Sequence, residues 1–188
     1  MKNYILPGIA AAMFLTGCLV TSVHPFYTSK EVTYEPALLG NWTNVQGAEE
    51  SWNFKNAGEN LYRVEYKADG KTNLLRGTLF KIGRVSFIDL TSWDTVCDVV
   101  PPPVASHFLL RMIQSPTKLR LAALNHDWLQ STLTSNPGLL QHLMVSEKDE
   151  KRVVLTAETA DIQKFLENHL STEVAWKDAF DLKRSAPF

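Results

Sequence analysis

The sequence predicts an α+β fold dominated by β-structure: an antiparallel meander that forms a barrel or half-barrel, with two or three C-terminal helices packed on it. Apolar residues recur with a period of two from residue 37 to about 124, which is typical of strands with one dry face. Tight-turn residues separate these runs. Helical spacing of apolar residues appears only later, most clearly over residues 159–170.

The strand pattern begins at residues 40–42 and continues through residues 51–55. Residues 61–67 alternate most clearly, with apolar side chains on one face and charged side chains on the other. The pair Asp69-Gly70 then predicts a hairpin turn. Short strands joined by such turns favour a closed or nearly closed meander. We expect its remaining strands at residues 74–82, 85–90, 108–113 and 119–124.

Residues 91–106 are the least regular part of the expected domain. They hold Cys97 and three consecutive prolines, Pro101 to Pro103, which favour a stiff extended segment. A rigid crossover between two parts of the sheet is the simpler interpretation. A lid or a docking loop is the alternative.

Helix signals follow residue 124. Asn125 is a suitable N-cap for a helix over residues 127–133. Asn136-Pro137 predicts the start of a second helix, which would run to about residue 143. Residues 152–155 return to a strand pattern, and Thr159 is expected to cap the clearest helix. That helix is predicted to dock on the sheet through Ile162, Phe165, Leu166 and Leu170.

The N-terminus has the pattern of a secretory signal: a charged start at Lys2, an apolar run from Tyr4, and small residues before a cleavage point. The run is near the lower length limit for spanning a bilayer and contains Pro7 and Gly8, so a transmembrane anchor is the weaker alternative. A plain secretory signal is the other alternative. The sequence therefore divides into a signal peptide, a tether, a domain and a tail, over residues 1–17, 18–36, 37–172 and 173–188. The tail is polar and expected to be loosely held, although Trp176 and Phe180 could pack back.

The end of the signal, Leu15-Thr16-Gly17-Cys18, resembles the lipobox of bacterial lipoproteins. The resemblance implies that Cys18 is acylated and becomes the first residue of the mature chain, held in a bacterial membrane by two or three acyl chains. Leu19 stands where an acidic residue would often retain a lipoprotein in the inner membrane. If the source is Gram-negative, the resemblance therefore implies the outer membrane.

Charge and cysteine content argue against several other functions. The formal net charge is −1 and no basic cluster is present, so no nucleic-acid partner is expected. The only cysteine besides Cys18 is Cys97, so acylation of Cys18 leaves no internal disulfide, and a buried, inert thiol is the simplest role for Cys97.

The five histidines form no zinc pattern, and we expect no metal and no cofactor. Without a nucleophile elbow or a phosphate loop, and with only sequence proximity linking Cys97 to His107, we expect no enzyme.

Gly40-Asn41-Trp42 matches the Gly-x-Trp motif that opens the first strand of lipocalins and related calycin barrels. The resemblance implies a calycin-like barrel in which Trp42 plugs a closed end. The chain also resembles uncharacterised bacterial lipoproteins, whose shared segments are present as residues 24–27, 36–42 and 154–157.

Two functions follow from these expectations. The first is a non-catalytic binding module for a small apolar ligand. Its principal ligand-binding candidates are Trp42, Trp52, Phe54, Tyr62 and Tyr66, and Val64, Phe80 and Phe87 are further candidates for the barrel interior. The same side chains could simply fill the barrel. The second is an envelope structural or assembly protein that binds another protein through its sheet edge or its proline-rich loop.

Overall fold

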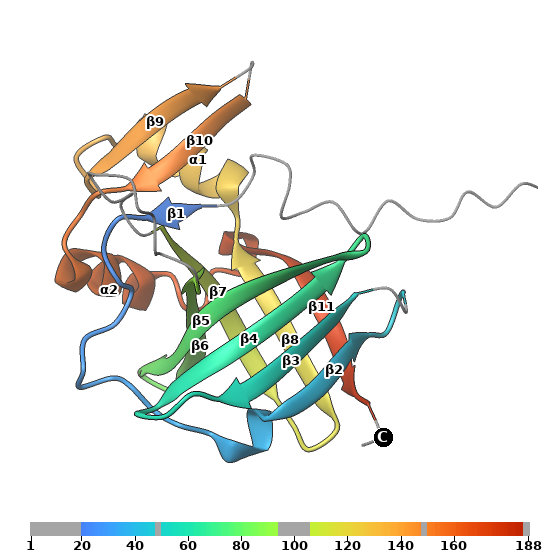
Figure 1. Cartoon of the computed structure of the whole chain (residues 1–188). Coiled ribbons are helices and arrows are strands. Elements are labelled where there is room, and N and C mark those ends of the chain that lie inside the picture. Colours follow the sequence, from blue (N-terminus) through green and yellow to red (C-terminus); the bar gives the residue numbers. More distant parts are fainter. Residues whose placement is uncertain (1–19, 48–49, 94–105, 148–149, 186–188) are drawn as a thin grey trace, which may run out of the picture.

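The computed structural model describes residues 20–47, 50–93, 106–147 and 150–185. Its centre is a closed antiparallel barrel of eight strands (Figure 1). Each strand pairs with the next along the chain, and the last pairs with the first, so the barrel is closed rather than half-open. The predicted β-dominated, calycin-like fold is therefore confirmed. The barrel strands are β2 (Gly40–Asn44), β3 (Ser51–Asn56), β4 (Leu61–Ala68), β5 (Lys71–Ile82), β6 (Val85–Ser92), β7 (His107–Gln114), β8 (Lys118–Leu124) and β11 (Trp176–Arg184).

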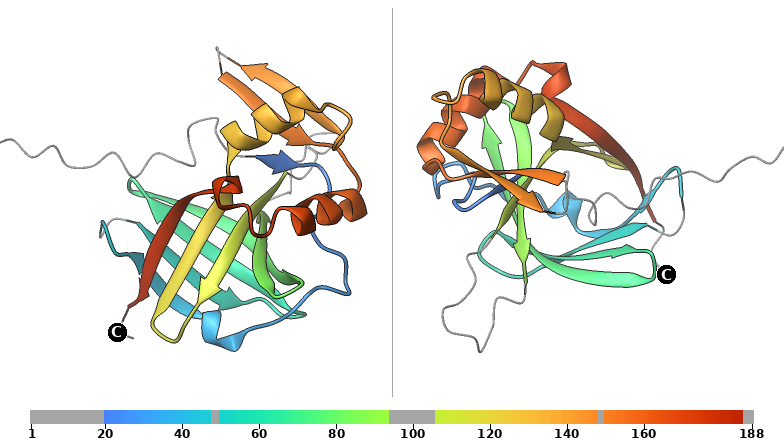
Figure 2. Two further views of the ribbon diagram at one scale, coloured as in Figure 1. Left: turned by 180° about the vertical axis from the view of Figure 1, so that it is seen from behind. Right: turned by 90° about the horizontal axis from the view of Figure 1, so that it is seen from above.

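Three further strands extend the sheet beyond the barrel. β1 (Thr21–Ser22) pairs antiparallel with the beginning of β7 and parallel with β10 (Glu150–Leu155). β9 (His142–Glu147) pairs with β10 and forms the edge of the sheet. In Figures 1 and 2 the β9–β10 hairpin projects away from the barrel beside β1.

Two α-helices lie between β8 and β11 in the chain: α1 (His126–Ser135) and α2 (Thr159–Asn168). The predicted cap of α1 is confirmed, because the Asn125 side chain accepts hydrogen bonds from the N–H groups of Asp127 and Trp128. The predicted cap of α2 is wrong. Glu158 precedes the helix without a side-chain cap, and the Thr159 hydroxyl instead donates to the carbonyl oxygen of Pro25 at 2.7 Å. Two short 3-10 helices, η1 (Pro36–Leu38) and η2 (Glu173–Ala175), complete the described elements.

The helix predicted from Asn136 to about residue 143 is wrong. A turn follows Asn136, and residues from His142 onward form strand β9. The carbonyl oxygen of Gln141 accepts from the N–H groups of both Thr156 and Ala157, which brings this segment beside the end of β10. The strand ladder with β10 prevails over the local helix signal of Asn136-Pro137, since propensity yields to tertiary pairing.

The loosely held tail is also wrong as predicted. Residues 176–184 form β11, which pairs with β8 on one side and β2 on the other and closes the barrel. Phe180 and Leu182 point into the core, whereas the neighbouring residues Asp181 and Lys183 are exposed. Because the outward residues are polar, the segment has a polar composition overall, although its inward residues are apolar as in any half-buried strand.

Residues 20–36, expected as a tether, belong to the folded domain. Their packing through Phe26 and Tyr27 is confirmed: Phe26 is completely buried, and the Tyr27 ring lies 5.8 Å from that of Phe80. The Phe26 N–H donates to a carboxylate oxygen of Asp89 at 3.0 Å. Segments 1–19 and 94–105, with Cys18, Cys97 and the three prolines, lie outside the described residues.

Two apolar cores share the wall of the barrel. The first core fills the barrel, and the second lies outside it, under α1, α2 and β10. Phe80 and Phe87, predicted to point inward, belong to the second core, with their rings 5.5 Å apart. The prediction is wrong because β5 and β6 are covered on both faces, and such strands carry apolar residues on both sides. The docking stripe of α2 is confirmed for Ile162, Phe165 and Leu166, which lie buried in this second core. Leu170, the fourth predicted residue, lies beyond the end of the helix and is only partly buried against the same core.

Candidate functional site

The five principal ligand-binding candidates meet inside the barrel, all at most 4% exposed. They contact one another. The ring of Trp52 lies 4.6 Å from Tyr66 and 6.2 Å from Phe54, and Phe54 lies 6.3 Å from Tyr62. Two pockets, one of about 400 Å³ beside Thr33 and one of about 410 Å³ beside α2, are both lined by other residues. The arrangement of the five side chains is that of a packed core.

Gly77 on β5 shows how tightly the middle of the barrel is filled. A Cβ atom at this position would lie 3.0 Å from the Ile88 side chain and 3.1 Å from that of Val64. Contacts this short require neighbouring side chains to move. The strand therefore has glycine where a methyl group would crowd core side chains, which indicates tight packing in this part of the interior.

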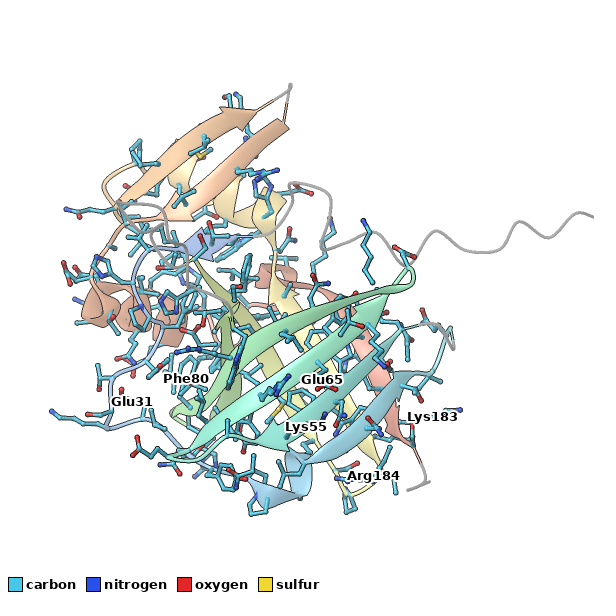
Figure 3. All side chains as sticks on the ribbon, viewed as in Figure 1. Glu31, Lys55, Glu65, Phe80, Lys183 and Arg184 are labelled. Atoms are coloured by element: carbon cyan, nitrogen blue, oxygen red, sulfur yellow. The ribbon has the colours of Figure 1, made fainter. Side chains whose placement is uncertain are left out.

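Trp42 plugs one end of the barrel. Its indole N–H donates to the carbonyl oxygen of Leu38 in η1 at 2.8 Å. Arg184 lies at the end of β11 (labelled in Figure 3). Its guanidinium lies over the indole ring of Trp42, 4.4 Å from the ring centroid. Arg184 also donates to the carbonyl oxygens of Leu39, at 2.8 Å, and of Ala37. The Trp42 indole, the Arg184 guanidinium and η1 together close this end of the barrel.

Arg184 is a residue that the sequence did not single out. A basic residue at the end of a polar-looking segment carries no local signal. Its role depends on β11 lying next to β2 and on η1 lying across the barrel end, and neither arrangement is visible in a short sequence window.

The segment from Thr33 to Ala37 is held across the same end by Tyr62. The Tyr62 hydroxyl donates to the carbonyl oxygen of Glu35 at 3.1 Å and accepts from the Glu35 N–H at 2.7 Å. Tyr34 stacks on Tyr62 with ring centroids 5.0 Å apart. Burial raises the pKa of Tyr62 to about 12, so the hydroxyl keeps the proton that it donates.

A pocket of about 400 Å³ opens beside this segment, between it and strands β5, β6 and β7. The hydroxyl oxygens of Thr33 and Tyr34 are buried in this region and have no hydrogen-bond partner in the part of the chain that the structure describes. Each of these oxygens has almost no accessible surface, so Thr33 and Tyr34 line the pocket through their other atoms. The lining residues are Thr33, Tyr34, Glu35, Ala37, Leu79, Lys81, Ser86, Met112, Gln114, Ser115 and Pro116.

A buried polar cluster lies at the other end of the barrel. The Asn44 amide donates to the Glu50 carboxylate at 2.7 Å, and Glu50 is only 5% exposed. Burial, followed by the charge of Glu50 and its hydrogen bond, raises the pKa of Tyr66 and keeps its hydroxyl protonated. Glu50 could not be predicted from the sequence, because a single carboxylate beside a strand forms no motif with its neighbours.

His107 has a structural partner in Asp89. Its Nδ1 atom lies 2.9 Å from a carboxylate oxygen of Asp89, which is buried and also binds the Phe26 N–H. This buried pair ties the N-terminal segment to β6 and β7. Among the described residues, no group of three His, Cys, Asp or Glu side chains is placed to hold a metal ion.

No helix in the described part of the chain is both long enough and apolar enough to cross a membrane. The chain matches no family model, no curated protein and no solved structure.

Proposed function

We propose that the protein is a membrane-anchored bacterial lipoprotein whose barrel binds a small molecule with an apolar body and a polar head. The observation that carries the ligand-binding part is the pocket of about 400 Å³, whose lining combines apolar and polar side chains. The size and the mixed lining are typical of small-molecule sites. Catalysis forms no part of the proposal.

The chemistry of the lining indicates the ligand class. Leu79, Met112 and the Tyr34 ring offer apolar contact, whereas Lys81, Ser86 and Gln114 offer charge and hydrogen bonds. Because the middle of the barrel is filled, a ligand would lie at this end and not among the five aromatic candidates. An anionic or hydrogen-bond-accepting head beside the Lys81 ammonium fits this distribution.

The pocket can be tested with 1-anilinonaphthalene-8-sulfonate, whose rings and sulfonate match an apolar body and an anionic head. Ser86→Phe places a phenyl ring in the pocket and is expected to weaken binding of this probe at least tenfold. The matched control is Thr72→Phe, which adds the same ring at an exposed position of β5 where no pocket residue lies. A folded Ser86→Phe protein that binds the probe as tightly as the control would refute this site. Mass spectrometry of small molecules that co-purify with the native lipoprotein would identify the natural ligand.

The anchoring part rests on the lipobox at Cys18. In the source organism the wild-type protein should fractionate with membranes, with the outer membrane if the source is Gram-negative, and should carry the added mass of its acyl chains. Cys18→Ser is expected to lose both the added mass and the membrane association. A Cys18→Ser protein that still partitions like the wild type would contradict the assignment.

The alternative function is an envelope structural or assembly protein. The observation in its favour is that β9 forms an edge of the sheet, and such an edge can pair with a strand of another chain. Chemical cross-linking in intact cells separates the two functions. A single recurrent protein cross-linked to β9, together with an empty pocket, would favour the assembly role.

A further inference from the structure

We propose that the outward face of the β9–β10 hairpin rests on the lipid bilayer that holds the acyl chains of Cys18, so that the domain has one fixed orientation on the membrane. This inference rests on the lipoprotein part of the proposed function. It goes beyond that part because it states which face of the domain meets the lipid.

The first argument is the length of chain between the anchor and the folded domain. Val20 is 4% exposed and belongs to the second core, and Thr21 and Ser22 form β1. Cys18 comes two residues earlier, and two residues span at most about 7 Å even when fully extended. The domain therefore has almost no tether, and the surface around the beginning of β1 must lie close to the bilayer.

The pairing of β1 then selects that surface. β1 runs parallel to β10, with Thr21 beside Val154 and Ser22 beside Leu155. The N-terminal end of β1 consequently points to the side of the sheet where β10 begins and β9 ends. The beginning of β1 and the hairpin thus lie on the same side of the domain (Figures 1 and 2).

The second argument is the apolar surface of the hairpin. Met144 lies opposite the buried residue Val153 and shares its face. Leu143 and Val145 lie on the other face, opposite Val154 and Arg152, and are 57% and 43% exposed. Adjacent exposed aliphatic side chains on an edge strand invite contact with another apolar phase. The bilayer beside the anchor is the nearest such phase.

The charges of the hairpin set the depth of the contact. Arg152 lies opposite Val145 and shares the face of Leu143 and Val145, which places a basic residue beside this apolar pair. Residues 147–151, which run from the end of β9 into β10, are all charged in the sequence. A stretch with this many charges does not enter the hydrocarbon of the bilayer. The proposed contact is therefore shallow, with Leu143 and Val145 at the boundary between headgroups and acyl chains.

Lipid-attached quenchers can test this orientation on the acylated mature protein, reconstituted in vesicles of phosphatidylethanolamine and phosphatidylglycerol. Val145→Cys, in a Cys97→Ser background, receives a nitrobenzoxadiazole label. The control label is placed at Lys118→Cys, an exposed position at the beginning of β8, beside the turn from β7 at the plugged end of the barrel. Phosphatidylcholine with a doxyl group at carbon 5 is expected to quench the label at position 145 several-fold more strongly than the label at position 118.

Each other outcome is decisive. Equal quenching at both positions in protein that floats with the vesicles would overturn the orientation and leave the anchor intact. A label at position 145 that is shielded equally in detergent without lipid would indicate a protein contact and would also overturn it. Protein that does not float with the vesicles would overturn the lipoprotein assignment itself, and the orientation with it.

Discussion

Replacing Trp42 with alanine is expected to lower the free energy of unfolding by about 3–5 kcal/mol, the usual cost of removing a large buried aromatic side chain. The indole is completely buried, and its loss removes the hydrogen bond to Leu38 and the surface on which Arg184 lies. Because small domains are stable by about 5–15 kcal/mol, this is a large share of the total. Chemical denaturation followed by circular dichroism measures the change.

Trp93→Ala is the matched control for this experiment. Trp93 is only partly buried and lies near two guanidinium groups, those of Arg63 at 5.6 Å and Arg76 at 5.2 Å. Its removal costs less, because exposed cation–π contacts contribute only about 0.5–1 kcal/mol each. If both variants unfold at the same denaturant concentration, Trp42 does not plug the barrel in the way described.

Phe165→Asp is expected to have an even larger effect. The phenyl ring is 4% exposed in the second core, 4.4 Å from the His169 ring and 6.0 Å from that of Trp128. The substitution removes the ring, at about 3–5 kcal/mol, and also places a carboxylate in a largely apolar core, where burial of a charge is costly. Since the second core packs on the outer face of β5 and β6, we expect a thermal transition far below that of the wild type.

Lys164→Asp provides the comparison, one residue away on the exposed face of α2. It introduces the same carboxylate into the same helix without touching the core, and its effect should be under about 0.5 kcal/mol. Comparable melting temperatures for the two variants would show that α2 does not dock through Phe165.

The strands were largely predictable because their periodicity is local. Residues 61–67 alternate, and the structure places them in β4 with Tyr62, Val64 and Tyr66 inside the barrel. Phe80 and Phe87 were predicted to point into the barrel, but they lie in the second core. When both faces of a strand are apolar, the period still predicts a strand but no longer indicates which face is the interior.

The candidate site was less predictable because its residues converge from distant parts of the chain. The pocket takes its lining from the segment after β1 and from β5, β6 and β7, and Arg184 reaches Trp42 only through closure of the barrel. Similarly, β11 was mistaken for a loose tail because its role is to complete a ladder between two strands far from it in sequence. Such assignments depend on pairing, and a single sequence does not reveal pairing.

Closure of the barrel by β11 also determines the order of events when the protein is synthesised. β2 emerges early from the ribosome, yet one of its two strand partners is β11, which comes after both helices and the β9–β10 hairpin. Until β11 arrives, β2 and β8 each present an open edge, and the nascent sheet is vulnerable to pairing with other chains. Contacts so distant in sequence also slow folding. The barrel can therefore close only once residues 176–184 have been synthesised, and a chain that stops before Trp176 would remain an unclosed, aggregation-prone sheet.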